Sequence, residues 1–417
     1  MCNQTCVWSY QVQFCRHAGP AGLLARAGRG RLAKRPVVWL MGVRRVGKSV
    51  LCQTLPDVDY YDCELPRVRR RLDDPQAFWG DHRGKRVVLD EVHRLPNPSE
   101  LLKIAADHFP DVRVLATGSS TLGASARFRD TLAGRKAEVW LTPMTLADLA
   151  DFSRTDLRHR LLRGGLPPFF LAPELPERDF QEWVDAYWAR DVLELFRLER
   201  RQSFQRLLEL LMAQSGSIFE ASPLARACEV SRTTIANYLA VLEATFVAHP
   251  VRPFVGGGAA EIVAAPKVYG FDTGFVCYHR GWHELRRDDL GPLWEHLVLN
   301  ELHAHLGSRA IHYWRTKHGA EIDFVLARRD GPPVAIECKW SADEFDAAGV
   351  RAFRSRYPTG PNLVVSADVD APYSRRYGGL TVRFVSLPGL IQELAPRRNS
   401  TPTRAARAAR HRFPPRG

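Results

Sequence analysis

The sequence has none of the long apolar runs that cross membranes, since no run approaches the roughly 20 residues that such a helix needs. Its first residues, MCNQTCVWSYQVQFCRHAG, also lack the basic start, the sustained apolar core and the small-residue cleavage site of a signal peptide. We therefore expect a cytoplasmic protein that has no membrane partner.

Cysteines arranged for disulfide pairing are also missing. Five of the eight cysteines stand singly among apolar segments, where reduced and buried thiols are expected: Cys52, Cys63, Cys228, Cys277 and Cys338. Cys2, Cys6 and Cys15 lie near His17, but their spacing fits no common zinc finger. The pattern favours reduced thiols over a disulfide framework. It also predicts that residues 1–30 are a poorly ordered leader, with a zinc site there as the alternative.

Acidic residues are outnumbered by basic ones, and the formal net charge is +13. Such an excess favours a nucleic-acid partner. Part of the excess lies in residues 396–417, which are rich in Arg, Pro and Ala, have little apolar surface to bury and are expected to be disordered. Two interpretations therefore stay open, a DNA-binding arm and a solvated tail.

The 417 residues, 45% of them hydrophobic, suffice for about two to four packed domains, and the first contains a phosphate-binding motif. GVRRVGKS follows the Val-rich run RPVVWLM and precedes SVLCQTL, which predicts a strand, a loop and a helix in that order. The loop N–H groups would surround the phosphates of ATP, Lys48 would reach the β- and γ-phosphates, and Ser49 would hold Mg²⁺. The predicted ATP-binding residues are Gly42, Val43, Arg44, Arg45, Val46, Gly47, Lys48, Ser49 and Val50.

Two adjacent carboxylates follow a later strand. A second strand is expected at VDYYD and a third in GKRVVLDEVHRLP, whose apolar part ends at Asp90 and Glu91. A carboxylate at the carboxyl end of a buried strand is placed to hold the water shell of magnesium, and we assign this role to Asp90. Glu91 is predicted to orient and deprotonate the attacking water.

Two further catalytic residues are predicted from their positions. The strand in DVRVLATGSS ends beside Ser119 and Ser120, and we predict Ser119, with Ser120 as its rival, as a sensor of the γ-phosphate; an ordinary turn is the alternative. A fifth strand is expected at EVWLTPM. Arg135, shortly before this strand, is predicted as an arginine finger that stabilises developing charge, with Arg127 and Arg129 as rivals.

The middle of the chain is predicted to be helical. The run FQEWVDAYWARDVLELFRLERR has the pattern of one amphipathic helix. Further on, three helices and a strand-like end have the outline of a winged helix. We expect DNA contacts from the exposed side of its third helix, through Arg232, Thr233, Thr234, Asn237 and Tyr238. A module that only packs domains together is the alternative.

A second group of charged side chains is predicted in the C-terminal part. A helix carries Glu295, and three strands follow in IHYWRTKHGAEIDFVLARRDGPPVAIECKWS, the last two joined by a hairpin loop. Glu321 and Asp323 share one face of the second strand because side chains alternate along a strand. Glu337 and Lys339 share one face of the next strand for the same reason. Antiparallel pairing would bring Asp323 near Glu337 and Lys339.

These residues predict a metal site. Asp323 and Glu337 would bind Mg²⁺, Lys339 would hold a phosphate or position a water, and Glu295 would complete the site. A solvated polar hairpin face is the alternative, although the apolar flanks FVL and VAI indicate buried strands whose acids need partners.

The motifs resemble those of a known family. GVRRVGKS, VVLDEVHRLP, TGSSTLGASARFRDTLAGR and RGGLPP are similar to motifs of a large prokaryotic family of AAA-type, STAND-related ATPases, over about residues 35 to 395. In that family an ATPase core is joined to a C-terminal domain of unknown function that resembles restriction endonucleases. The residues Asp323, Glu337 and Lys339 match the PD-(D/E)xK pattern of such nucleases. His93 departs from the family, in which many members have Gln.

The resemblance implies an α/β fold: a P-loop NTPase with a central parallel sheet, a helical lid, a winged helix and a C-terminal α/β restriction-endonuclease-like domain. The predicted division is a leader (1–30), the ATPase core (31–150), a helical lid or connector (151–205), the winged helix (206–262), the nuclease-like domain (263–395) and a basic tail (396–417).

The predicted function is that of a Mg²⁺-dependent switch protein that binds and hydrolyses ATP and is linked to DNA processing or defence. One alternative is a metal-dependent DNA nuclease regulated by ATP. The other is a non-catalytic regulator that binds DNA or a protein partner. The oligomeric state is left open.

Overall fold

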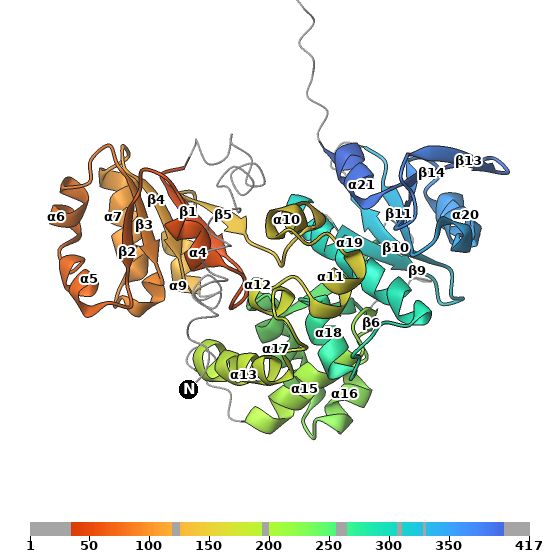
Figure 1. Ribbon diagram of the computed structural model, residues 1–417, viewed down its shortest axis with the longest axis horizontal. Helices are drawn as coiled ribbons and strands as arrows, with labels where there is room; N and C mark the ends of the chain where they lie inside the picture. Colours follow the sequence, from red (N-terminus) through yellow and green to blue (C-terminus); the bar gives the residue numbers. More distant parts are fainter. Residues whose placement is uncertain are drawn as a thin grey trace, which may run out of the picture.

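Three successive parts of the chain are told apart by colour in Figure 1: an N-terminal α/β part, a mainly helical middle part and a C-terminal α/β part. The computed structural model describes residues 35–118, 126–193, 200–255, 265–306, 311–327 and 331–395. Within these ranges no helix combines the length and the apolar character that a membrane span requires.

The N-terminal part is built on a five-stranded parallel sheet in the order β2-β3-β4-β1-β5. Its strands are β1 (Val37–Met41), β2 (Asp59–Asp62), β3 (Arg86–Asp90), β4 (Arg113–Thr117) and β5 (Lys136–Trp140). Its helices are α4 (Lys48–Gln53), α5 (Pro66–Arg71), α6 (Pro75–Gly80), α7 (Pro98–His108) and α9 (Ala126–Thr131), with a 3₁₀ turn η1 (Val92–Arg94). The predicted central parallel sheet is therefore confirmed.

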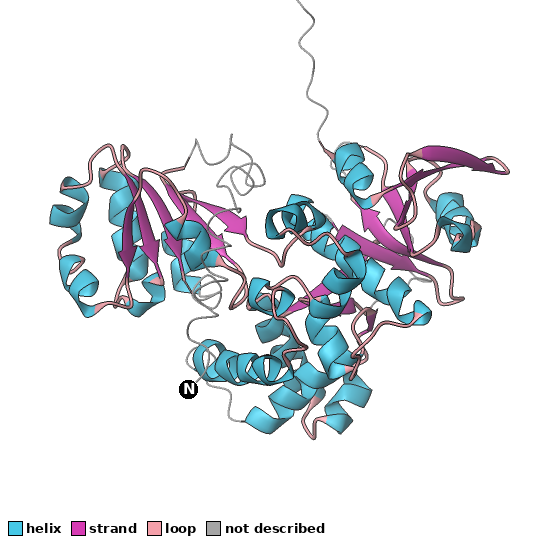
Figure 2. Cartoon of the chain, viewed as in Figure 1, coloured by secondary structure: helices cyan, strands magenta, loops and turns pink. Residues whose placement is uncertain are grey.

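Helices cover both sides of this sheet (Figure 2), as expected for parallel strands that are apolar on both faces. On one face Trp39 packs with Leu101 of α7 and Phe128 of α9. On the other face Leu40 packs against Leu51 of α4. Because all five strands are parallel, their carboxyl ends share one edge, and the predicted ATP-binding loop leaves the sheet at that edge.

The middle part consists mainly of helices. They are α10 (Leu146–Leu149), η2 (Ala150–Phe152), α11 (Leu157–Arg163), α12 (Pro167–Phe170), α13 (Glu177–Tyr187), η3 (Trp188–Val192), α15 (Arg201–Ala213), α16 (Ala221–Ala227), α17 (Arg232–Ala244) and α18 (Thr273–His279). Three strands lie among them: β6 (Ser217–Ile218), β7 (Ala248–Pro253) and β8 (Lys267–Gly270). Residues 151–193 are called the connector below.

The connector contains a π turn where the sequence predicted a single α-helix. The single amphipathic helix predicted there is an α-helix only as far as Tyr187, and a π turn, η3, continues it. The apolar pattern of a sequence does not distinguish an α turn from a single π turn, because one inserted residue affects too few positions to be recognised in a short amphipathic pattern. Residues 194–199 lie outside the described ranges.

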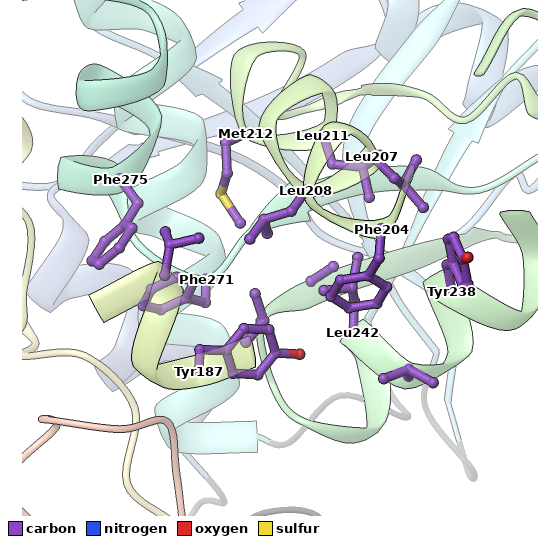
Figure 3. Packing of buried hydrophobic residues seen from close by; sticks show 14 of the residues in the cluster. Tyr187, Phe204, Leu207, Leu208, Leu211, Met212, Tyr238, Leu242, Phe271 and Phe275 are labelled. Atoms are coloured by element: carbon purple, nitrogen blue, oxygen red, sulfur yellow. The ribbon is translucent and has the colours of Figure 1, made fainter. Parts of the chain in front are cut away.

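One apolar core joins the helices of the middle part. The ring of Phe204 on α15 lies between Tyr187 of α13 and Tyr238 of α17 (Figure 3), with ring centroids 6.5 and 5.2 Å apart. Val43 and Val46, from the predicted ATP-binding loop, belong to the same core. The loop is thus packed against the middle part as well as against its own sheet.

The C-terminal part contains a mixed sheet of nine strands in the order β13-β14-β12-β11-β10-β9-β7-β8-β6. Its remaining strands are β9 (Ile311–Arg315), β10 (Glu321–Leu326), β11 (Val334–Lys339), β12 (Asn362–Ser366), β13 (Tyr373–Tyr377) and β14 (Leu380–Val385). Its helices are α19 (Arg287–Leu306), η6 (Ala342–Glu344), α20 (Ala348–Arg356) and α21 (Leu387–Leu394).

Two predicted domain boundaries can be compared with the strands and helices. The boundary between residues 262 and 263 lies outside the described residues, between β7 and β8, which are antiparallel neighbours in one sheet. The boundary between residues 205 and 206 lies within α15. The division into domains stays a prediction.

Candidate nucleotide site and C-terminal carboxylate cluster

The predicted ATP-binding loop joins the carboxyl end of β1 to the start of α4. Gly42 has a φ angle of 153°, and a Cβ at this position would lie 2.5 Å from the carbonyl oxygen of Leu141. Gly47, with a φ angle of 103°, immediately precedes α4. Only glycine adopts such backbone angles without strain, so the two glycines of the motif give the loop its shape.

The side chain of Lys48 is folded over this loop. Its Nζ atom donates hydrogen bonds to the carbonyl oxygens of Gly42 at 2.8 Å and Val43 at 3.1 Å. Burial lowers the pKa of Lys48, while the negative charges of Glu91 and Asp191 act in the opposite direction. The ammonium group therefore lies in the field of nearby carboxylates while it bonds to backbone carbonyls.

Asp90, at the end of β3, is held by two hydroxyl groups. The side chain is 3% exposed and accepts hydrogen bonds from Thr117 and, at 2.7 Å, from Tyr60. The Thr117 hydroxyl oxygen also accepts a hydrogen bond from the backbone N–H of Glu91 at 3.1 Å. Neutral donors satisfy a buried carboxylate without adding an opposing charge. Thr117 and Tyr60 were not identified from the sequence, in which their only signal is a position on the strands beside β3.

Neighbouring side chains lower the pKa of Glu91. His93 Nδ1 lies 3.0 Å from Glu91 Oε2. Burial by itself raises the pKa of Glu91, but the hydrogen bond with His93 and the charge of Lys48 outweigh it, so the pKa of Glu91 lies below its ordinary value. Glu91 is therefore an ionised carboxylate. The departure from the family at His93, which had no assigned role, supplies this hydrogen bond.

The predicted phosphate sensor is not part of the described structure. Ser119 and its rival Ser120 lie outside the described residues, as does the side chain of Arg127. Arg129 is an exposed residue of α9.

Arg135 lies at the wrong edge of the sheet for the predicted role in its own chain. The parallel pairing of Lys136 with Val37 places Arg135 at the amino edge, whereas the loop follows the carboxyl end of β1. Its guanidinium group pairs with Asp107 of α7, with Nε 2.6 Å from Oδ1. The structure therefore does not bring Arg135 to the loop of its own chain, because a residue just before a parallel strand lies opposite to the loops that follow such strands.

The C-terminal carboxylates assemble across two neighbouring strands. β10 and β11 pair in an antiparallel register that sets Asp323 beside Glu337. Lys339 Nζ lies 2.9 Å from Glu337 Oε2 and 3.7 Å from Asp323 Oδ2. The backbone N–H of Cys338 donates a hydrogen bond to Asp323 at 2.8 Å. These four residues form one compact buried group.

A second lysine, which the sequence analysis missed, enters this group from β8. Lys267 is 5% exposed, and its Nζ atom lies 3.0 Å from Glu295 Oε1 and 2.5 Å from Glu321 Oε1. Tyr269, on the same strand, donates a hydrogen bond to Glu295. The only sequence signal was the spacing of Lys267 and Tyr269 by two, which places them on one face of a strand.

The charged groups of this cluster shift the pKa of Glu337 in opposite directions. Burial raises the pKa of Glu337 to about 8, and the charge of Asp323 adds to this rise, while Lys339 opposes it. Within the described ranges, no group of three or more His, Cys, Asp or Glu side chains is placed to hold a metal ion. The Mg²⁺ site at Asp323 and Glu337 stays a prediction; in the structure the ammonium group of Lys339 lies beside both carboxylates.

The predicted DNA-contacting helix is α17. Arg232, Thr233 and Asn237 are exposed and Thr234 is half-buried. Tyr238 is only 3% exposed, so its predicted place on the exposed side is wrong. Its ring fills the apolar core of the middle part instead.

A cavity of about 580 Å³ lies beside the start of α17. Arg200, Arg226 and Arg232 line it together with Glu229. Three guanidinium groups against one carboxylate give the cavity an excess of positive charge, which favours an anion such as a phosphate group.

Solved structures with some likeness to this chain include a signal transduction ATPase with numerous domains (STAND) from Pyrococcus horikoshii and Cdc6p from Pyrobaculum aerophilum, both at 12% sequence identity. The first match covers 66% of this chain and 45% of that chain with a TM-score of 0.26. The second covers 64% and 93%, respectively, with a TM-score of 0.27. At such low TM-scores these likenesses carry no argument about fold or function.

Family profiles match the chain in three consecutive segments: an AAA domain (34–150) and two domains of unknown function, DUF8612 (154–286) and DUF4143 (290–388). The uncharacterized proteins Rv2008c of Mycobacterium tuberculosis and Mb2031c of Mycobacterium bovis are each 30% identical over 324 residues, 75% of this chain and 72% of theirs. The chain therefore belongs to the AAA-type ATPase family that its motifs indicated, in which an AAA domain is followed by a C-terminal domain of unknown function.

Proposed function

We propose that the protein binds ATP at the loop of residues 42–50 and hydrolyses it. The observation that carries this proposal is that Lys48 and the ionised Glu91 lie together at the carboxyl edge of the parallel sheet. A loop whose glycines keep side chains away, and whose N–H groups precede a helix, suits a polyphosphate. The adjacent carboxylate suits the activation of water.

The residues present fit ATP together with Mg²⁺. Ser49 supplies a hydroxyl group in the first turn of α4, and Asp90 supplies a carboxylate at the same edge of the sheet. Mg²⁺ commonly takes one or two such protein ligands and completes its shell with phosphate oxygens and water. When bound, Mg²⁺ would neutralise charge on the phosphates. In this proposal Glu91 orients a water molecule and accepts its proton.

We further propose that hydrolysis acts as a switch in DNA processing or defence. Support comes from the packing of Val43 and Val46, which link the loop to the core of the middle part. A change of loop structure on ATP binding or hydrolysis would therefore be transmitted to helices that lie outside the nucleotide domain.

Replacing Lys48 with alanine tests ATP hydrolysis. We expect phosphate release with ATP and Mg²⁺ to fall at least about a hundredfold, as when a preorganised electrostatic donor is removed. Lys103→Ala is a matched control because Lys103 is an exposed residue of α7, and this variant should behave as wild type. A wild-type protein that releases no phosphate, or a Lys48→Ala variant that keeps its activity, would contradict the proposal.

A second candidate function is DNA binding by the middle part. The cavity lined by Arg200, Arg226 and Arg232 favours it, because clustered arginines suit the phosphates of a nucleic-acid backbone. We expect an Arg226→Ala, Arg232→Ala double variant to bind duplex DNA more weakly, with a salt dependence reduced by about two counterions. Arg178→Ala, which removes an exposed arginine of α13, serves as the control. Equal binding by the double variant and wild type would exclude this role.

For the C-terminal domain we propose that it binds DNA or a protein partner and does not cleave DNA with a metal ion. Lys267 and Lys339 support this choice because each contacts carboxylates that a metal would need. Plasmid DNA incubated with Mg²⁺ or Mn²⁺ should stay intact with wild type and with Asp323→Ala alike. Cleavage by wild type that Asp323→Ala abolishes would favour the nuclease alternative.

A further inference from the structure

Asp191 of the connector reaches the nucleotide loop. It lies in the π turn η3, is 8% exposed, and its Oδ2 atom accepts a hydrogen bond from Arg44 Nε at 3.3 Å. Its charge also acts on Lys48. The two residues of the ion pair are 147 positions apart in the chain, so this contact belongs to the tertiary structure. π turns within helices frequently occur at functional sites.

The loop and the connector are joined at neighbouring positions. The indole N–H of Trp183 on α13 donates a hydrogen bond to the carbonyl oxygen of Arg44 at 3.0 Å. The guanidinium group of Arg45 lies over the ring of Phe169 on α12, 5.9 Å from its centroid. The arginines of the motif therefore face the connector.

Asp191 thus acts on the two cations that a bound polyphosphate would also attract. Arg44 Nε bonds to it, and Lys48 lies within its field. The phosphates of ATP at the loop would place several negative charges near the same cations, where they would repel Asp191 and compete for Arg44. The side chain of Arg44 is 28% exposed and that of Asp191 is 12% exposed. Because Arg44 is partly in contact with solvent, its guanidinium group can rotate away from Asp191 toward a bound phosphate.

We propose that the Arg44–Asp191 ion pair is a nucleotide-responsive link: Asp191 holds Arg44 while the loop has no nucleotide, and ATP displaces Asp191 and releases the connector. This inference rests on the proposed binding of ATP at the loop. It assigns a positioning role to Asp191 and a use to Arg44, which the phosphate-binding motif itself does not require.

Asp191→Asn tests the link, and Asp185→Asn is its matched control. Asp185 lies on the adjoining helix α13 and also pairs with an arginine, Arg201 at 2.8 Å, but not with the loop. We expect Asp191→Asn to bind ATP roughly tenfold more tightly than wild type, because the competing arrangement is removed. Asp185→Asn should bind ATP as wild type does.

Hydrogen exchange of residues 177–193 provides the second readout. In wild type, ATP should increase amide exchange in this segment. In Asp191→Asn the exchange should be fast already without ATP, and ATP should change it little. Unchanged ATP affinity and unchanged exchange in Asp191→Asn would overturn the role of Asp191 while leaving ATP binding intact. A wild type that does not bind ATP would overturn both the link and the proposed function.

Arg44→Gln keeps the inference testable if Asp191→Asn does not fold. It removes the same ion pair from its more exposed side. We expect fast exchange of residues 177–193 without ATP, as in Asp191→Asn, but weaker ATP binding, because a cation near the phosphates is lost. Exchange equal to that of wild type in Arg44→Gln would also overturn the link.

Discussion

The molecule contains two buried groups in which lysine and carboxylates meet, and they are built differently. In the nucleotide site Lys48 bonds to backbone carbonyls, while Asp90 accepts hydrogen bonds from hydroxyl groups. In the C-terminal cluster Lys267 bonds directly to Glu295 and Glu321. In the nucleotide site Lys48 and Asp90 therefore each bond to neutral groups, whereas in the C-terminal cluster the lysine bonds to carboxylates.

This difference indicates what each group is suited to. A buried ion pair offsets the cost of removing both charges from water, but its charges are then largely satisfied by each other. Charges that are held by neutral donors and acceptors remain available to an incoming ion. We therefore infer that the nucleotide site is arranged for a ligand and the C-terminal cluster for structure.

The largest effect is expected from Lys267→Met in the C-terminal cluster. Removing the buried ammonium group leaves the half-buried Glu295 and Glu321 without this cation, and breaking a buried ion pair costs about 3–5 kcal/mol of unfolding free energy. Chemical unfolding measures the loss. Lys85→Met is the control, because Lys85 forms an exposed ion pair with Asp59.

The Lys267→Met variant also tests whether the lysine prevents the carboxylates from binding a metal ion. Without Lys267 the carboxylates face one another, so Mn²⁺ should raise the melting temperature of Lys267→Met and leave that of wild type unchanged. A wild type that is itself stabilised by Mn²⁺, with no difference after Lys267 is replaced, would show that the cluster is a metal site after all.

The second largest effect is expected from Asp90→Asn. ATP turnover should fall at least about a hundredfold, because the carboxylate at the end of β3 is part of the ligand-binding arrangement. Asp323→Asn changes a carboxylate of the paired cluster, and it should leave turnover within about twofold of wild type, since distant sites act independently. Phosphate release by both folded variants is the measurement. Equal losses in the two would abolish the distinction between the regions.

A moderate effect of pH on stability is expected where β5 of the nucleotide sheet meets β7 and α19. Trp140 of β5 packs against His249 of β7 and His303 of α19, with ring centroids 5.1 and 4.9 Å apart. Burial lowers the pKa of His249 to about 4 and holds that of His303 well below its ordinary value. Both imidazoles stay neutral in the folded protein, whereas the unfolded chain takes up protons below about pH 6.5. Stability should therefore be full above that pH and decline as the pH falls toward 4.

His303→Leu should flatten this decline. One histidine contributes a slope of about 1.4 kcal/mol per pH unit over the range in which only the unfolded chain is protonated. Urea unfolding at pH 7, at roughly pH 6 and at roughly pH 5 measures the slope. His108→Gln, which changes an exposed histidine, should keep the wild-type slope. An unchanged slope in His303→Leu would mean that His303 is protonated in the folded protein.

The smallest effect is expected from Arg135→Ala. Arg135 lies at the amino edge of the nucleotide sheet and pairs with Asp107, so turnover should stay within about twofold of wild type at low protein concentration. A large loss of turnover that appears only as the protein concentration rises would show that Arg135 serves the site of another copy.

Much of the nucleotide site was predictable because its parts are local. The two glycines, Lys48 and Ser49 lie within one loop and one turn of helix, and Asp90 ends a strongly apolar strand. Loop geometry and strand patterns are short-range properties, so these residues could be assigned before any contact was known. The position of Arg135 at the amino edge of the sheet was not predictable in this way, because it depends on the pairing of β5 with β1.

The contacts that distinguish the two charged groups were not predictable in this way. Lys267 lies 28 positions from Glu295, on a strand whose neighbours were unknown. The same holds for α17, in which Tyr238 is buried and Thr234 is half-buried. Packing against other helices determines which of the two is covered.

By itself, the sequence determined the loop, the parallel sheet around it and the carboxylates that follow its strands, because these depend on residue type and spacing over a few positions. Only the tertiary structure decided the partners of the charges: Asp191 for Arg44, His93 for Glu91 and Lys267 for Glu295. A buried charge takes its chemistry from its surroundings, and those surroundings come from strands and helices that only folding brings together.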